Sequence, residues 1–247
     1  MLGQYGEELA AARAASQINP ENRLALWCEL RALASNGRVD EFRSRLDALE
    51  EMGSQAIPAT IGGTEIQAAG TTAQLLFRLA NELEAHGDSA ESRRTLTRTL
   101  AWLRTRSDAD RRSLIGRYDL AQGLYLLGDL DAAQPLIARL AAQQPTTTVF
   151  ITMQGLVAAR RGLRIDAERA VERLAALEDR FDLGRTVYAR AQIAARLGDS
   201  AESIRLLQQI ALRRAPYSEF GNALRADPEL ASLRRNPAFL KLVAPKG

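Results

Sequence analysis

The 247-residue chain has very few of the side chains that carry metal or thiol chemistry, with one cysteine and one histidine. One cysteine cannot form an intramolecular disulfide or a cysteine-based zinc site, and one histidine cannot build a multi-histidine metal site. His86 has no second histidine and no nucleophile as a partner, and Cys28 has no neighbouring histidine in the sequence. There is no phosphate-loop, zinc-protease or hydrolase motif. We therefore predict no catalytic residue, no metal and no cofactor in this chain.

Long hydrophobic runs are also missing. No segment approaches the roughly 18 uninterrupted apolar residues that a membrane helix needs, and the N-terminus is acidic where a signal peptide would be basic. Contact with a membrane is expected only through an upstream segment. The compartment stays open: cytoplasmic, or periplasmic if the parent protein has a transmembrane helix upstream.

Lysine is scarce, because 31 of the 33 basic residues are arginines, and the 30 acidic residues leave a net charge of +3. Eight arginines lie between Arg93 and Arg117 with only Asp108 and Asp110 among them. Such a run could attract phosphate or nucleic acid. No aromatic residue beyond Trp102 interleaves with it, so the run is typical of a solvated helix face. We do not expect a nucleic-acid partner.

The chain is rich in helix-forming residues, and 46% of its residues are hydrophobic. Its apolar residues have helical spacing almost throughout, which predicts an all-α fold. A glycine turn recurs along the chain, followed in most cases by a small or acidic residue that can cap the next helix. The turn glycines, at intervals of 34, 50, 41, 34 and 36 residues, are Gly3, Gly37, Gly87, Gly128, Gly162 and Gly198.

From Gly3 to Pro216, this repetition resembles the tetratricopeptide repeat (TPR) family, whose period is 34 residues. The family has a small residue seven before the turn glycine, another five after it, and a large apolar residue nine after it. The chain offers Ala80, Ala121, Gly155 and Ala191 at the first position, Ser92, Ala133, Ala167 and Ser203 at the second, and Leu46, Leu96, Ile137, Val171 and Leu207 at the third. Leu30, Glu8 and Phe42 depart from this pattern.

The resemblance implies a right-handed α-solenoid of antiparallel helix pairs. An irregular α-solenoid without this ancestry is the alternative, and either stack offers an extended binding surface.

Two breaks in the period organise the chain. Sixteen extra residues coincide with a Gly-, Thr- and Pro-containing segment, which we predict to be a loop and which could be a surface insertion, a lid or a hinge. The second break has seven extra residues near Thr105–Asp110, and lengthened helices there would explain them. The predicted organisation is a half-repeat plus one repeat (1–52), the inserted loop (53–72), four repeats (73–216) and a capping segment (217–247).

The two ends of the chain differ. Because Gly3 is a turn glycine, residues 9–18 are expected to form the second helix of a repeat whose first helix is missing, as in a piece cut from a longer protein. At the other end, Asp227-Pro228 and Asn236-Pro237 predict two short helix starts. Their apolar residues, expected to fold onto the last repeat, are Leu230, Leu233, Phe239 and Leu242.

This C-terminal tail is similar to the one that closes the TPR regions of many bacterial multidomain signalling proteins, including serine/threonine kinases, winged-helix regulators and nucleotide cyclases. The match covers about twenty residues from Asn222 to Leu240. It implies a sensory or partner-binding region and does not identify an upstream effector.

The resemblance also implies that the first helix of each repeat lines a concave groove, with the residues ten and six before the turn glycine pointing into it. Aromatic residues recur at the first offset, and amide or arginine residues at the second. This combination suits recognition of a peptide. The candidate groove residues, including neighbours, are Trp27, Arg31, Phe77, Arg78, Asn81, Tyr118, Asp119, Gln122, Tyr125, Tyr188, Gln192 and Arg196. Alternatively, the aromatics pack in seams between helices.

The predicted function is therefore a non-catalytic TPR module that binds a protein or peptide segment, as the sensor or scaffold region of a bacterial signal-transduction protein. The alternative is the C-terminal regulatory fragment of an enzyme, above all a serine/threonine protein kinase, whose catalytic domain is absent from this chain. Self-association through the first repeat is a third interpretation. The pattern departs from the lysine and asparagine clamp of chaperone-binding TPR proteins, so capture of a C-terminal carboxylate is not expected.

Overall fold

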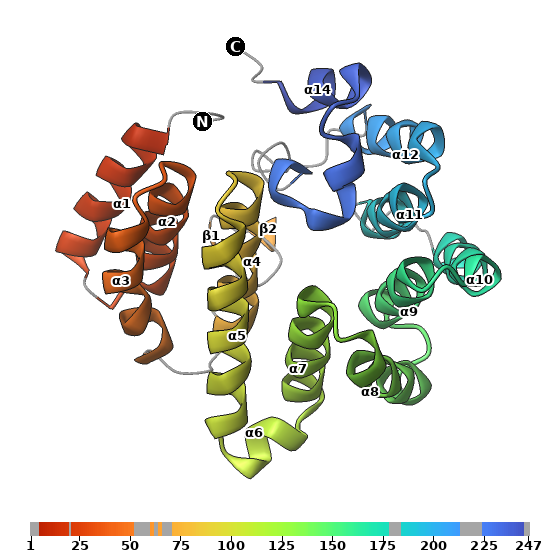
Figure 1. Cartoon of the computed structure of the whole chain (residues 1–247), viewed down its shortest axis with the longest axis horizontal. Helices are drawn as coiled ribbons and strands as arrows, with labels where there is room; N and C mark the ends of the chain where they lie inside the picture. The colour runs from red at the N-terminus through yellow and green to blue at the C-terminus, as the bar shows by residue number, and fades with distance from the viewer. Residues whose placement is uncertain are drawn as a thin grey trace. The chain divides into compact units, whose positions relative to one another are not determined.

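The computed structural model describes residues 5–19, 21–51, 60–61, 64–65, 71–177, 184–212 and 224–244. The chain divides into two compact units, residues 1–111 and 112–247 (Figure 1). Unit 1 contains α1 (Tyr5–Ile18), α2 (Arg23–Ser35), α3 (Val39–Glu51), β1 (Thr60–Ile61), β2 (Thr64–Glu65), α4 (Thr72–Ala85) and α5 (Ser89–Thr105), and α6 (Asp108–Arg112) runs across the boundary. Unit 2 contains α7 (Leu114–Leu127), α8 (Leu130–Gln143), α9 (Thr148–Arg160), α10 (Arg164–Ala176), α11 (Arg185–Arg196), α12 (Ser200–Leu212), the 3-10 helix η1 (Pro228–Leu233) and α14 (Pro237–Val243).

Successive helices pack as pairs joined by the predicted turns: α4 with α5, α7 with α8, α9 with α10, and α11 with α12. All five turn glycines in the described residues have positive φ between 67° and 93°, the left-handed conformation that glycine adopts without strain. Asp88 and Asp129 cap the helices that follow, each accepting a backbone N–H three residues on. The chain has an all-α, TPR-like α-solenoid fold. Gly3 and Pro216 lie outside the described residues.

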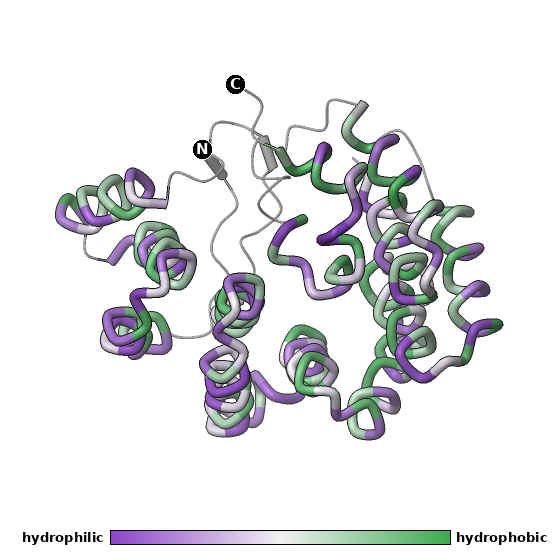
Figure 2. Tube along the Cα trace, turned by 45° about the horizontal axis from the view of Figure 1, so that its top comes forward, coloured by the Kyte–Doolittle hydropathy of each residue, from purple (hydrophilic) through white to green (hydrophobic). Residues whose placement is uncertain are grey.

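Hydrophobic residues alternate with hydrophilic ones along the tube (Figure 2). The small residues at the two family positions lie where the helices of a pair meet. Ala80, Ala121 and Ala191 are fully buried. Ser203 Oγ donates a hydrogen bond of 2.7 Å to the carbonyl oxygen of Ala191, so these two positions are in direct contact.

The core of unit 1 continues across the inserted segment. Leucines of α4 pack in one buried cluster with leucines of α1, α2 and α3. The helices before and after residues 53–72 therefore share a core, and most of the predicted loop lies outside the described residues. Within the segment, the structure describes only β1 and β2, which pair antiparallel with Thr60 opposite Glu65 and Ile61 opposite Thr64.

The division into units falls instead beside the second break in the period. The seven extra residues near Thr105–Asp110 were expected to lengthen the helices. The structure shows a 17-residue α5 and then a separate five-residue helix, α6, at the unit boundary. The four repeats predicted for 73–216 are thus divided, with α4 and α5 in unit 1 and the later pairs in unit 2.

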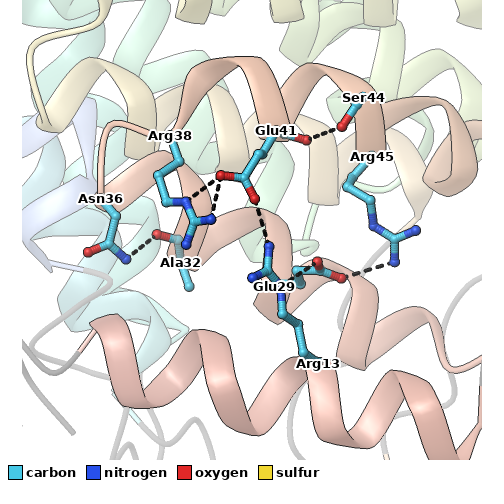
Figure 3. Close-up of polar contacts among 8 residues, drawn as sticks. All are labelled: Arg13, Glu29, Ala32, Asn36, Arg38, Glu41, Ser44 and Arg45. Atoms are coloured by element: carbon cyan, nitrogen blue, oxygen red, sulfur yellow. Dashed lines mark hydrogen bonds and ion pairs between the residues drawn. The ribbon is translucent and has the colours of Figure 1, made fainter.

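A carboxylate inside unit 1 ties three helices together (Figure 3). Glu29 of α2 accepts from Arg13 of α1 at 3.2 Å and from Arg45 of α3 at 3.0 Å. Arg13 also donates to Glu41 at 2.8 Å, and Glu41 accepts from Arg38. The Glu29 side chain is 5% exposed, whereas that of Glu41 is 44% exposed. Solvent screens Glu41, so we assign the structural role to Glu29.

We predict that Glu29→Gln destabilises unit 1 by about 1–3 kcal/mol, because a buried acceptor for two guanidinium groups loses its charge. Glu41→Gln is the matched control and should cost clearly less. Urea unfolding of both variants tests the ranking, and equal losses would contradict it.

Gly155 of α9 shows how tightly one pair is packed. A Cβ atom at this position would lie 2.5 Å from Cδ1 of Ile193 and 2.9 Å from Cβ of Ala170. Ile193 can turn its terminal methyl away, but the Cβ of Ala170 moves only with the α10 backbone. No side chain therefore fits without displacing one of the helices.

We predict that Gly155→Ala destabilises unit 2 by about 1–2 kcal/mol despite the higher helix propensity of alanine, since overpacking outweighs that gain. Gly6→Ala in α1, where a new Cβ meets nothing within 4 Å, is the control and should be neutral or stabilising. Thermal denaturation measures both. A stabilised Gly155→Ala protein would show that α9 and α10 separate at little cost.

Candidate functional site

Three candidate groove residues of unit 2 share one face of α11. Tyr188, Gln192 and Arg196 are spaced four residues apart, so their side chains lie above one another along the helix. This face is covered by residues 227–229 of the same chain, at the start of η1, where the C-terminal ribbon runs beside α11 (Figure 1). The predicted groove residues therefore hold a peptide segment, which is the chain's own.

The first anchor of this segment is Asp227. Its Oδ2 atom accepts a hydrogen bond from the Tyr188 hydroxyl and another, of 2.8 Å, from Nε2 of Gln192. Its Oδ1 atom accepts from the backbone N–H of Glu229 at 2.7 Å, which caps η1. One carboxylate thus starts the 3-10 helix and fastens it to α11.

The second anchor is Glu229, whose side chain is 5% exposed. Its Oε2 atom accepts from the Tyr125 hydroxyl of α7 at 2.8 Å and pairs with Nε of Arg196. Arg196 also donates through Nη2 to the carbonyl oxygen of Pro228 at 3.0 Å. A buried carboxylate is stable only when it is paired and hydrogen-bonded, and here a guanidinium and a phenol satisfy it.

Apolar residues complete the docking. The two predicted helix starts are present, with Asp227 and Asn236 as caps and a proline at the first helical position of η1 and of α14. Leu230, Leu233 and Phe239 are buried in one cluster with residues of α11 and α12. The segment therefore closes the end of the last helix pair, as the sequence predicted for the capping region.

The electrostatics of the docked segment follow from this burial. Loss of water around the carboxyl, together with the neighbouring Glu229 carboxylate, raises the pKa of Asp227 to about 6. Burial, then the Asp227 charge, raises the pKa of the Tyr188 phenol well above its ordinary value. Burial and the Glu229 charge do the same to the pKa of Tyr125. Both phenols are neutral donors at physiological pH.

Other candidates of unit 2 lie on α7. Tyr118 packs against Phe150 of α9, with ring centroids 5.8 Å apart and planes tilted by 54°. Asp119 is buried, and Gln122 is half-buried with an Oε1 atom that has no hydrogen-bond partner among the described residues. Sequence reasoning missed Arg160 of α9, which covers the Tyr125 ring at 4.5 Å and donates to its carbonyl oxygen.

The candidates of unit 1 are arranged differently. Trp27 and Phe77 are 6% and 1% exposed, and Trp27 belongs to the buried cluster formed by α1, α2, α3 and α4. Arg31 lies over the Trp27 ring at 4.9 Å and pairs with Glu8 of α1. That pair explains why Glu8 stands where the family has a small residue.

Two further candidates of unit 1 belong to α4. Arg78 is exposed on this helix, and Asn81 is half-buried.

Several charged residues outside this site have structural partners. In the arginine-rich run, Arg94 pairs with Glu91, Arg98 with Asp47 and Glu50, Arg106 with Asp110, and Arg111 with Asp108. His86 lies 3.5 Å from Glu82 and meets the edge of the Tyr5 ring. In the described part of the chain, no group of three or more His, Cys, Asp or Glu residues could hold a metal, and no helix has the length and hydropathy to span a membrane.

A second surface feature is a cavity of about 320 Å³ between α8, α9 and α10. Ile137, Val157 and Ala170 contribute apolar lining. Two of its arginines are partnered, since Arg169 pairs with Asp166 and Arg173 donates to Gln154 and to the carbonyl oxygen of Pro145. The sequence did not single out this surface.

No protein-family model matches the chain, and the search of curated proteins found no match either. Among solved structures, the chain is similar to YrrB, described as a TPR protein with an unusual peptide-binding site. The identity is 15% and the TM-score 0.33, over 85% of this chain and 95% of that chain. The helix pairs and positive-φ turn glycines define the TPR-like fold of the present chain.

The raised pKa of Asp227 predicts how docking depends on pH. The docked carboxyl, with a pKa of about 6, binds a proton more tightly than a free one with a pKa near 3.8. Docking should be strongest below about pH 4, weaken as the pH rises to about 6, and stay constant above that. Amide hydrogen exchange in η1, corrected for the intrinsic exchange rates, measures the strength of docking at each pH. Asp227→Asn, which keeps a capping oxygen, should remove the dependence; a dependence that survives would assign it to another group.

Proposed function

We propose that this chain is a non-catalytic, protein-binding TPR-like module that recognises a segment of a partner protein. The proposed recognition surface is the α11 face, defined here as Tyr188, Gln192 and Arg196 together with Tyr125 of α7. The observation that carries the proposal is that these four side chains, all nominated from the sequence as groove residues, contact residues 227–229 of the chain. They can therefore bind a peptide segment.

The chemistry of the α11 face supports this proposal. Tyrosine and arginine dominate binding energy at protein interfaces because each combines a large apolar body with a hydrogen-bonding tip. The face supplies two phenols, an amide and a guanidinium, so its hydrogen-bond donors outnumber its acceptors. A partner segment rich in acceptors, such as carboxylates and backbone carbonyls, matches that surface.

The sensor or scaffold role in bacterial signal transduction is part of the same proposal. Its support is the resemblance of residues 222–240 to the tails of TPR regions in signalling proteins. Binding through the unit 1 residues Trp27, Arg31, Phe77, Arg78 and Asn81 also stays a prediction. The first three of these would have to become more exposed to contact a partner.

The test is selection from a random peptide display library on the intact chain. We expect enriched peptides that bind with micromolar affinity and that lose at least tenfold in affinity with Arg196→Ala. Arg205→Ala is the matched control, because this arginine of α12 is exposed and pairs only with Glu202 among the contacts seen. Peptides that bind both variants equally would place recognition elsewhere. Phosphotransfer or ATP hydrolysis by this chain would contradict the non-catalytic proposal.

A further inference from the structure

The structure contains a bound example of what the α11 face can accept. We propose that this face is specific for partner segments of the form Asp-Pro-Glu-Leu-x-x-Leu, and that residues 227–233 of the chain are a resident competitor that such a partner must displace. The inference rests on the proposed function, because it specifies the ligand of the same face. It adds the sequence pattern of the ligand and an autoinhibited resting state.

The two acidic positions are distinguished by their contacts. The first carboxylate is held by a phenol and an amide, and the second by a phenol and a guanidinium. Between them, the proline carbonyl accepts from Arg196. Proline suits this position because its φ is fixed near the helical value and because it has no N–H to leave unpaired at the start of a helix. A lysine or arginine at either acidic position would face hydrogen-bond donors.

The two leucines set the spacing that follows. Leu230 and Leu233 are fully buried against α11 and α12, in the same cluster as Val187, Leu207 and Ile210. A partner that displaced only the acidic turn would strip these leucines from the core. It must therefore supply its own apolar residues at the same two positions. The specificity thus combines two carboxyl groups with two apolar side chains over seven residues.

The resident segment has the advantage of being in the same chain. Asp227 follows α12, which ends at Leu212, by fifteen positions. Docking of the resident segment is therefore intramolecular, which raises its effective concentration at the α11 face above that of a dilute free partner. A free partner at micromolar concentration competes poorly with it unless docking of the resident segment is weakened.

The experiment uses a labelled synthetic peptide with the sequence of residues 225–235 and the intact 247-residue chain. The Asp227→Ala/Glu229→Ala variant loses both acidic anchors in cis and keeps Leu230, Leu233 and Phe239. We expect the peptide to bind this variant at least tenfold more tightly than the unmodified chain. Adding Arg196→Ala to this variant should weaken its affinity for the peptide at least tenfold. A peptide with Ala in place of its Asp, which removes the acceptor and the cap, and Gln in place of its Glu, which removes the charge that Arg196 pairs with, should bind at least tenfold more weakly.

Should the double alanine variant lose helical circular dichroism, Glu229→Gln replaces it, since this side chain keeps its size and loses the charge that Arg196 pairs with. Three results would overturn the inference: no binding to the weakened variants, equal binding to the unmodified chain, or binding that ignores Arg196. These failures are distinct from failure of the proposed function. Library peptides that need Arg196 but lack two acidic positions would sustain the α11 face as a binding surface and refute this specificity.

Discussion

The arrangement of this protein depends on the close approach of the two helices within each pair. At the crossing, one helix presents alanine or glycine and the other alanine or serine, so the backbones come near enough for Ser203 to donate to the carbonyl oxygen of Ala191. Gly155 shows the limit, because even one methyl group there would overlap Ala170 and Ile193. This contact fixes the rotation of each helix about its axis. The rotation of α11 in turn decides that Tyr188, Gln192 and Arg196 face the C-terminal segment and not the core.

The features that the sequence predicted are those set by local chemistry or by a short period. Turn glycines, capping aspartates and proline helix starts act within a few residues, and the small residues recur at fixed offsets from the turn. The division at residues 111 and 112 could not be predicted in this way, because it reflects which helices share a core. The inserted segment was a candidate hinge on composition, yet the leucines of α4 pack with those of α2 across it.

Only part of the candidate site could be predicted from the sequence, because the site too depends on which helices and segments pack together. Counting from the turn glycine identifies the side of a helix, but it cannot tell whether a neighbour covers that side. Thus Phe77 is buried and 1% exposed, while Tyr125 contacts a residue 104 positions later in the chain. The sequence did carry one signal for the occupant. Asp227 and Glu229 flank a proline in a tail expected to fold onto the last repeat, and Arg196 is a cation in that repeat.

A segment that served only to close the end of the stack would have little use for these carboxylates. Covering exposed core requires apolar contact, which Leu230, Leu233 and Phe239 already provide. Burying Glu229 adds a desolvation cost that its partners must offset, and buried ion pairs are often no more stabilising than apolar residues of the same size. The advantage of a buried ion pair is its direction, since Arg196 and Tyr125 bind a carboxylate in one position and register only. Selectivity of that kind is expected of a recognition surface, which supports a face adapted to discriminate among acidic segments.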